Sequence, residues 1–259
     1  MNSKPIGMFD SGVGGLNVLK EIKKTLPNED IIYLGDTNNF PYGNKSEQTI
    51  IELSRKCVEF LLKKNVKLII IACGTATSQA LDILNKEYDI PIIGILQPTV
   101  EYLKTKVKSG QNVGVIATNG TIKSMQWEKR IKEEIKECDV KSMACPLLAP
   151  LAEEGWTSNE VAKYTIKEYM KPFKNIDYLV LGCTHYPLFK DLIIEELGKG
   201  VDVIDTGEKL GKYLKEYLQN KDFLKDQEKA KYEIYLTDTE ANFIEVAKKL
   251  DNNAVIKHI

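Results

Sequence analysis

The feature that most constrains the fold of this chain is the regular alternation of continuous apolar runs with amphipathic stretches. The apolar runs are Pro5–Asp10, Ile31–Gly35, Leu68–Cys73, Pro91–Leu96, Val113–Ala117, Tyr178–Cys183 and Val201–Asp205. Because these runs are apolar throughout, they predict parallel strands covered by helices on both faces. The intervening stretches with apolar residues at helical spacing are Leu16–Thr25, Thr49–Lys64, Thr77–Tyr88, Ile122–Glu137 and Ser158–Tyr169. This alternation predicts an α/β fold with mostly parallel sheets.

The chain also repeats a pair of strand-end motifs at nearly one spacing. One strand runs into a glycine-rich turn after Asp10, and a later strand ends at Cys73. Their counterparts end at Thr118 and Cys183, which are 108 and 110 residues further along. The shared offset predicts two similar α/β lobes that face each other across an active-site cleft.

The end of the chain is expected to return to the first lobe. The expected elements there are a helix at Glu208–Gln219, a lysine-rich connection at Asn220–Lys231, a strand at Tyr232–Leu236 and a helix at Glu240–Leu250. If this tail packs on the first lobe, the second lobe is an insertion. We therefore expect a first lobe of residues 1–96 and 206–259 and a second lobe of residues 97–205.

Two of the five cysteines occupy matching positions at predicted strand ends. A buried cysteine is often only a small apolar residue, and we interpret Cys57, Cys138 and Cys145 in that way. Cys73 and Cys183 instead lie where open α/β sheets bind ligands. A thiol with a pKa of about 8.5 becomes a usable base after a modest shift. Two thiols in equivalent places indicate acid and base chemistry on one substrate.

The two cysteines have different polar neighbours in the sequence. His185 follows Cys183 by two residues, and an imidazole can exchange protons with a thiol. Asp10 ends the first strand, in the lobe expected to hold Cys73, although it can also cap the helix that follows. The neighbours predict two proton carriers of unequal character. His258 is the penultimate residue, and we expect it to lie in a frayed terminus.

The glycine-rich turn Asp-Ser-Gly-Val-Gly-Gly-Leu, which begins at Asp10, allows two interpretations. It lacks the Gly-Lys-Ser/Thr of a P-loop, and Asn17 stands where a dinucleotide fingerprint needs its third glycine. Asp36, however, ends the second strand near the place of a ribose-binding acid. We favour a helix N-terminus that presents backbone amides to an anion, for which a carboxylate serves as well as a phosphate.

Composition limits the classes of partner. With 36 basic and 37 acidic residues, the net charge of -1 gives no reason to expect nucleic acid or an anionic membrane surface. No segment approaches the roughly 18 apolar residues of a membrane helix, and the first residues lack a secretory pattern. Five cysteines without a CxxC pair argue against a disulfide framework and a zinc site. We expect a cytoplasmic protein that needs no metal, pyridoxal phosphate or other cofactor.

Several blocks together resemble the glutamate racemases of the aspartate/glutamate racemase superfamily. They are Phe9-Asp10-Ser11-Gly12-Val13-Gly14-Gly15, Asp36-Thr37 through Pro41-Tyr42-Gly43, Ala72-Cys73-Gly74-Thr75-Ala76, Thr118-Asn119-Gly120-Thr121 and Gly182-Cys183-Thr184-His185-Tyr186-Pro187. The blocks occur in order over most of the chain, and the Cys-Thr-His-Tyr-Pro block is specific for this family.

The resemblance implies an activity and a set of site residues. It implies cofactor-independent interconversion of L- and D-glutamate, with supply of D-glutamate to peptidoglycan, in a homodimer. Cys73 and Cys183 would be the acid and base, assisted by Asp10 and His185. The implied substrate contacts are Asp10, Ser11, Tyr42, Gly43, Gly74, Thr75, Thr184 and His185, with Thr118, Thr121 and Glu153 as second-tier neighbours.

Gly74 is the position at which this chain departs from the family pattern, which usually has asparagine after the first catalytic cysteine. Glycine removes one side-chain contact to the substrate, and we expect Gly74→Asn to lower KM for glutamate. The departure leaves open a racemase for aspartate or another amino acid. Two further alternatives are a nucleotide-binding oxidoreductase and a two-lobed, non-catalytic binder of amino acids or nucleotides.

Overall fold

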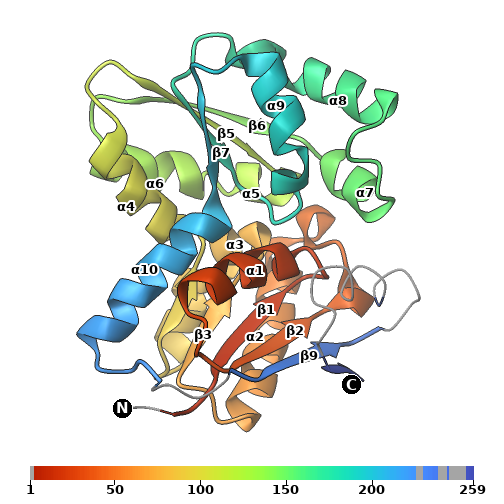
Figure 1. Ribbon diagram of the computed structural model, residues 1–259, viewed down its shortest axis with the longest axis vertical. Helices are drawn as coiled ribbons and strands as arrows, with labels where there is room; N and C mark the ends of the chain where they lie inside the picture. The colour runs from red at the N-terminus through yellow and green to blue at the C-terminus, as the bar shows by residue number, and fades with distance from the viewer. Residues whose placement is uncertain (1–2, 226–229, 239–243, 245–254) are drawn as a thin grey trace.

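Two parallel β-sheets form the framework of the molecule (Figure 1). The computed structural model describes residues 3–225, 230–238, 244 and 255–259. The first sheet has the order β10-β9-β2-β1-β3-β4, and the second has the order β6-β5-β7-β8. The first contains β1 (Ile6–Asp10), β2 (Ile31–Gly35), β3 (Leu68–Ile71), β4 (Ile92–Gly94), β9 (Tyr232–Leu236) and β10 (Val255–His258). The second contains β5 (Asn112–Ala117), β6 (Asp139–Ala144), β7 (Tyr178–Leu181) and β8 (Asp202–Asp205).

Helices cover both faces of the first sheet, as the apolar strands require. The covering helices are α1 (Gly15–Thr25), α2 (Glu47–Lys63), α3 (Gly74–Glu87) and α10 (Thr206–Asn220). Met8 of β1 packs with residues of α1 and α10, whereas the next residue, Phe9, packs with residues of α2 and α3. Adjacent side chains of one strand thus enter separate cores, because they point to opposite faces of the sheet.

The second sheet is covered in the same way. Its helices are α4 (Leu96–Lys106), α5 (Asn119–Lys123), α6 (Gln126–Glu134), α7 (Leu148–Glu153), α8 (Glu160–Met170) and α9 (Lys190–Leu197). Val115 of β5 packs with residues of α4 and α6, and Ile116 packs with residues of α7, α8 and α9. Among the described residues, no helix is both long and apolar enough to cross a bilayer.

The two sheets share one topology, and the α/β fold expected from the sequence is confirmed. The run β2-β1-β3-β4 corresponds to β6-β5-β7-β8, so β1 matches β5 and β3 matches β7. In each sheet the strand order reverses between the two central strands, and ligands bind outside the carboxyl ends at such a reversal. Cys73 and Cys183 each lie two residues beyond a central strand, β3 and β7, at that point.

One apolar cluster joins the two sheets. It lies next to the two places where the chain passes from one sheet to the other. Leu103 of α4 and Leu214 of α10 belong to one cluster, which also contains residues of β1 and β5. Lys209 of α10 lies with its Nζ 4.0 Å from the ring centre of Tyr102 of α4. Helices α4 and α10 therefore couple the halves of the molecule on the side where the chain crosses between them (Figure 1).

Several predicted elements differ from the structure. The single helix expected over Ile122–Glu137 is two helices, α5 and α6, because Met125 has a left-handed φ of 56° that interrupts the helical path. Strand β6 and helices α4, α7 and α9 were not predicted. His258 is not in a frayed terminus, since it lies in β10 and pairs with Leu236. The helix expected over Glu240–Leu250 falls outside the described residues, apart from position 244.

Candidate active site

A cavity lies between the carboxyl ends of the two sheets, with a volume of about 330 Å³ including its opening to solvent. Loops of both sheets contribute to its wall. The lining residues are Ser11, Phe40, Pro41, Tyr42, Gly43, Cys73, Gly74, Thr75, Thr118, Ala149, Gly182, Cys183, Thr184 and His185. Most residues that the sequence predicts for the site therefore converge on one space. Asp10, Thr121 and Glu153 are not in the wall and lie behind it.

Cys73 is held at the start of a helix. It is the N-cap of α3, and its Sγ accepts a hydrogen bond from the amide of Ala76 at 3.5 Å. The same sulfur lies 3.6 Å from Oγ of Ser11, to which the thiol donates. Burial and the nearby charge of Asp10 raise the pKa of Cys73 to about 12. Cys73 is therefore a protonated thiol at neutral pH, suited to donate a proton.

Asp10 stands behind Ser11 at the end of β1 and is fully buried. Its Oδ1 accepts a hydrogen bond from the amide of Gly12 at 3.0 Å. Within the described part of the chain, Oδ2 has no hydrogen-bond partner. Burial raises the pKa of this carboxyl above its ordinary value, against the opposing effect of His185. Asp10 is thus placed to act on the electrostatics of the site from behind its wall.

Cys183 has a different partner, the imidazole of His185. The Sγ of Cys183 lies 3.8 Å from Nδ1 of His185, and Nε2 of the ring lies 2.5 Å from Oε1 of Glu153. Burial lowers the pKa of His185, but the hydrogen bonds to Cys183 and Glu153 outweigh it and raise the pKa to about 10. At neutral pH the ring is an imidazolium between a sulfur and a carboxylate. It can stabilise negative charge on Cys183.

Three threonine hydroxyls form a bridge across the site. Oγ1 of Thr75 lies 2.8 Å from Oγ1 of Thr118, and Thr118 lies 3.0 Å from Thr121. Thr75 belongs to α3 of the first sheet, whereas the other two belong to α5 and its N-cap in the second. Hydroxyls that pair with one another here can turn to a charged ligand, because each is both donor and acceptor.

Tyr42 lines the cavity, but its hydroxyl is already used. The phenol donates a 2.6 Å hydrogen bond to Oδ2 of Asp36, and burial raises its pKa above the ordinary value. Asp36 also accepts hydrogen bonds from Asn39 and Thr237. The acid considered as a ribose ligand on sequence grounds is therefore a support for Tyr42, whose hydroxyl proton is already donated to Asp36.

The glycine-rich turn packs closely against a loop of the second sheet, and this close packing explains why position 14 is a glycine. A Cβ at Gly14 would fall well within 3.0 Å of the ring of His185 and of the hydroxyl of Thr184. Asn17 Nδ2 donates to the carbonyl of Thr184 at 3.0 Å. The turn thus packs closely against the His185 loop, which gives a reason for the glycine other than a nucleotide phosphate.

Some cavity residues were not predicted. Phe40, Pro41 and Gly182 lie inside or beside the sequence blocks and could have been inferred from them. The ring of Phe40 lies 5.8 Å from that of His185, measured between centroids. Ala149 of α7 has no such signal, because it is an ordinary apolar residue of an amphipathic helix.

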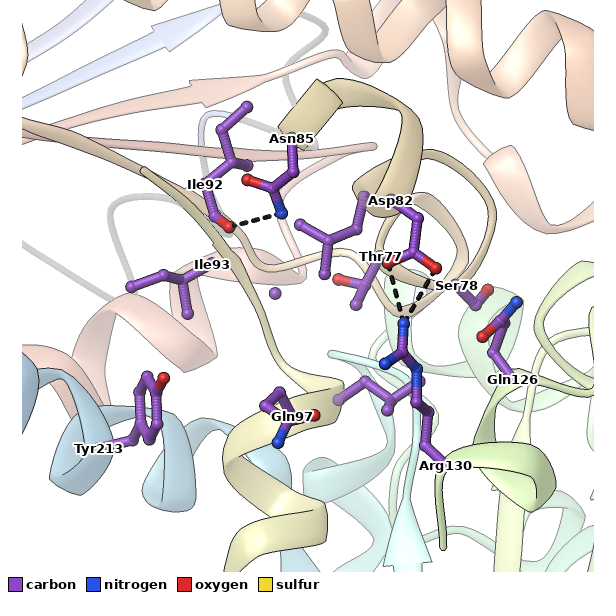
Figure 2. Close-up of a pocket in the computed structure, with 13 residues that line it drawn as sticks. Thr77, Ser78, Asp82, Asn85, Ile92, Ile93, Gln97, Gln126, Arg130 and Tyr213 are labelled. Carbon is purple, nitrogen blue, oxygen red and sulfur yellow. Dashed lines mark hydrogen bonds and ion pairs between the residues drawn. The ribbon is translucent and has the colours of Figure 1, made fainter. Parts of the chain in front are cut away.

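A larger hollow lies outside this site, between α3, β4, α4, α6 and α10 (Figure 2). It contains no thiol or imidazole among its lining residues. Its most polar feature is Arg130, which makes a bidentate pair with Asp82 at 2.9 Å to each oxygen. The two thiols and the imidazole line the smaller cavity instead.

Comparison with known families gives the class of protein. Residues 6–210 match the sequence profile of the Asp/Glu/hydantoin racemase family. That span contains every residue that lines the cavity. The fold and the site together define an amino-acid racemase, which is an isomerase.

Among the described residues, no group of three or more His, Cys, Asp or Glu side chains could hold a metal ion.

Individual relatives narrow the class. The chain is 44% identical over 249 residues to a glutamate racemase of Geobacter metallireducens, covering 95% of this chain and 92% of the relative. A glutamate racemase isoform of Bacillus anthracis superposes with a TM-score of 0.95 at 35% identity, over 99% of this chain and 97% of that one. The glutamate racemase of Francisella tularensis, whose crystal structure was solved in complex with D-glutamate, superposes with a TM-score of 0.92 at 35% identity, over 100% of this chain and 98% of that one. The chain belongs to the glutamate racemases.

Proposed function

We propose that this protein interconverts L- and D-glutamate, with Cys73 and Cys183 as the two proton-transfer groups. The observation that carries the proposal is the meeting of two thiols, from equivalent strand ends of two sheets, in the wall of one cavity. A racemase needs an acid and a base on opposite faces of one carbon. Two thiols that come from equivalent strand ends of two sheets and line one cavity support that arrangement. Aspartate racemisation and non-catalytic binding are not favoured, because the relatives compared above are all glutamate racemases.

The surroundings of the two sulfurs define the steps. With Cys183 as a thiolate facing the imidazolium of His185, the sulfur removes the α-proton, forming S–H as the C–H bond breaks. Cys73 then donates its proton to the opposite face, so that a new C–H bond forms and Cys73 becomes a thiolate. The opposite enantiomer reacts with the roles exchanged. The site must stabilise the intermediate carbanion through fixed dipoles and charges.

Substrate contacts are proposed for the polar groups of the wall. Hydroxyl and backbone groups of the site can hold the two carboxylates of glutamate, and Asp10 assists Cys73 from behind. The proposed contact set in the wall is Ser11, Tyr42, Gly43, Gly74, Thr75, Thr184 and His185, and Asp10 acts on the bound substrate from behind this set. Thr118, Thr121 and Glu153 support this set.

Substitution of each cysteine tests the mechanism. Cys73→Ala and Cys183→Ala should each abolish racemisation in both directions, because each removes one of the two proton carriers. The assay is circular dichroism of L- or D-glutamate, with folding checked in the far ultraviolet. Cys-to-Ser variants should retain one-sided exchange of the α-proton in deuterated water. Normal racemisation by Cys183→Ala would overturn the two-thiol assignment.

The chemistry assigned to the two thiols requires no added cofactor. We therefore expect full activity after dialysis against a chelator, measured by the same assay without added metal or pyridoxal phosphate. Loss of activity together with loss of a visible absorbance band would contradict this expectation.

The cellular setting follows from the same proposal. Two thiols that must remain reduced favour the cytoplasm, where the product D-glutamate would enter peptidoglycan synthesis.

We propose a first lobe of residues 1–96 and 206–259 and a second lobe of residues 97–205, and we propose that the two lobes separate to admit substrate. We also propose a homodimer, by resemblance to the family. Sedimentation that shows only monomer at working concentration would remove the last proposal.

A further inference from the structure

One face of helix α3 meets the second sheet at three points along its length. Thr75, Gln79 and Asp82 are spaced four and three residues apart, so their side chains lie on the same side of the helix. Thr75 lines the cavity and belongs to the threonine bridge described above. The three residues become more exposed in chain order, from buried Thr75 through half-buried Gln79 to exposed Asp82. This face therefore runs from the cavity wall to the surface of the molecule.

The two outer residues of this face contact helices α5 and α6 of the second sheet. Nε2 of Gln79 donates a 2.9 Å hydrogen bond to the carbonyl oxygen of Gly120 in α5. Nη2 of Arg130 in α6 lies 2.9 Å from each carboxylate oxygen of Asp82 (Figure 2). These contacts are polar, and polar interfaces are typical of parts of a chain that move relative to each other.

The opposite side of the junction between the sheets is apolar. There Leu103 of α4 and Leu214 of α10 belong to one buried cluster. The hollow of Figure 2 lies between these two helices and α3. Separation of the cluster would expose apolar side chains to water, which is unfavourable, whereas polar groups on α3 can exchange their partners for water. The junction therefore favours a hinge at α4 and α10 and an opening along the face of α3.

Such an opening would give access to the sulfurs. The exposed fraction is only 5% for Cys73 and 7% for Cys183. A substrate the size of glutamate can reach sulfurs so deeply covered only when parts of the cavity wall separate. Thr75 and Thr118 lie in that wall and bond to each other across the junction. Separation along the face of α3 therefore opens the cavity.

We infer that Asp82 and Arg130 form a latch that holds the second sheet against α3 and so sets how often the cavity opens. The pair lies at the surface end of the face, and it must break when the face separates. Asp82 and Arg130 are positioning residues, since neither lines the cavity. The inference goes beyond the proposed function, because the latch would control entry to the cavity whichever amino acid binds there.

Iodoacetamide labelling of the cysteines, followed by peptide mass spectrometry, tests the latch. In Arg130→Met, Cys73 and Cys183 should react about two- to fivefold faster than in the wild type, because loss of an exposed ion pair shifts an equilibrium by about that factor. Methionine keeps an apolar stem and removes the charge. Arg55→Met is the matched control, since it breaks a partly exposed pair with Glu87 that joins α3 to α2, beside the first sheet alone. Its labelling should equal that of the wild type.

Two other cysteines distinguish opening of the latch from unfolding. Cys57 lies in a core cluster of the first sheet, and Cys145 lies in a core cluster of the second. Opening of the latch leaves both covered, so their labelling rates in Arg130→Met should equal those in the wild type. Equal acceleration of these two cysteines together with Cys73 and Cys183 would mean that the substitution only destabilises the fold, and it would overturn the inference.

Exchange of the two charges tests the pair itself. Asp82→Arg should label Cys73 and Cys183 faster than Arg130→Met does, because it places two guanidinium groups together. The double variant Asp82→Arg, Arg130→Asp should restore slow labelling, and equally fast labelling in that variant would overturn the inference. About 1 M potassium chloride, at which the screening length is about 3 Å, should accelerate labelling of the wild type and leave that of Arg130→Met nearly unchanged.

The remaining outcomes separate the latch from the proposed function. Unchanged labelling of Cys73 and Cys183 in Arg130→Met would show that the inference is wrong. Should this variant fail to fold, Asp82→Asn removes the same pair from the side of α3, with faster labelling supporting the inference and unchanged labelling overturning it. Circular dichroism of glutamate tests the proposed function separately, because a wild type that fails to racemise glutamate still allows the labelling measurement.

Discussion

The two sulfurs of the site lie in unequal surroundings, although their strands are equivalent. Cys73 faces a hydroxyl and lies near the buried carboxyl of Asp10, which together with burial keeps it protonated. Cys183 faces an imidazole that is backed by Glu153. The repeat in the fold therefore equips the site with one proton donor and one sulfur beside a cation. This difference at single residues governs the expected response to pH.

Glu153→Gln should move the basic limb of the pH profile of kcat/KM to lower pH. The Glu153 carboxylate raises the pKa of His185, and the imidazolium is present below that pKa and lost above it. A hydrogen bond to a charged group is worth about 1.5–3 kcal/mol, or about 1–2 pH units. Glu154→Gln, on the exposed neighbouring residue, should leave the limb in place. An unmoved limb in Glu153→Gln would show that the carboxylate does not tune His185.

At the scale of elements, one buried ion pair joins three connections at the amino end of the first sheet. Lys67 precedes β3 and pairs with Glu29, which precedes β2, at 2.5 Å. The side chains are 0% and 2% exposed. Lys67 also donates to the carbonyl of Phe223, beyond α10. The pair therefore holds the segment that follows α10 against the sheet that carries Cys73.

Lys67→Met should destabilise the fold by about 3–5 kcal/mol, because it leaves a buried carboxylate without its cation. Urea unfolding followed by circular dichroism measures the change. The control is Arg55→Met, which breaks a partly exposed pair with Glu87 between α2 and α3 and should destabilise the fold far less, because solvent screens this pair. Equal losses in the two variants would mean that burial does not set the strength of the inner pair.

At the scale of the whole molecule, the shared cluster between α4 and α10 makes the two sheets depend on each other. Both tryptophans, Trp127 and Trp156, lie among the elements of the second sheet, so fluorescence reports that half alone. Far-ultraviolet circular dichroism reports both halves. The two signals therefore show whether the halves unfold together.

We expect the fluorescence and circular dichroism transitions in urea to coincide in the wild type. Leu103→Ala, in the shared cluster, should shift both by about 2–5 kcal/mol, the usual effect of emptying a buried leucine site. Glu101→Ala, on the exposed side of α4, should change stability by less than about 0.5 kcal/mol. Two separated transitions in the wild type would show that the cluster does not couple the halves.

The sequence predicts those parts of the molecule that depend on local burial. Strands β1, β2, β3, β5 and β7 are buried on both faces, so their apolar runs are continuous and easily recognised. Strand β6 was missed because it is an edge strand of mixed polarity, with exposed Asp139 and Lys141. The break at Met125 was missed because helical periodicity continues across it, and nothing local to the sequence marks the left-handed residue.

The functional site likewise contains some features that the sequence predicts and others that only the tertiary structure decides. Cys73, Cys183 and His185 could be selected from the sequence, because strand ends and short spacings are local properties. That Glu153 backs His185, that Asp36 holds Tyr42 and that Gly74 meets Gly182 were decided by the tertiary structure alone. Gly74 and Gly182 are 108 residues apart, and their contact exists only because two separate sheets close on each other. Residue periodicity records which face of an element is buried, but it carries no information on how closely two folded sheets approach.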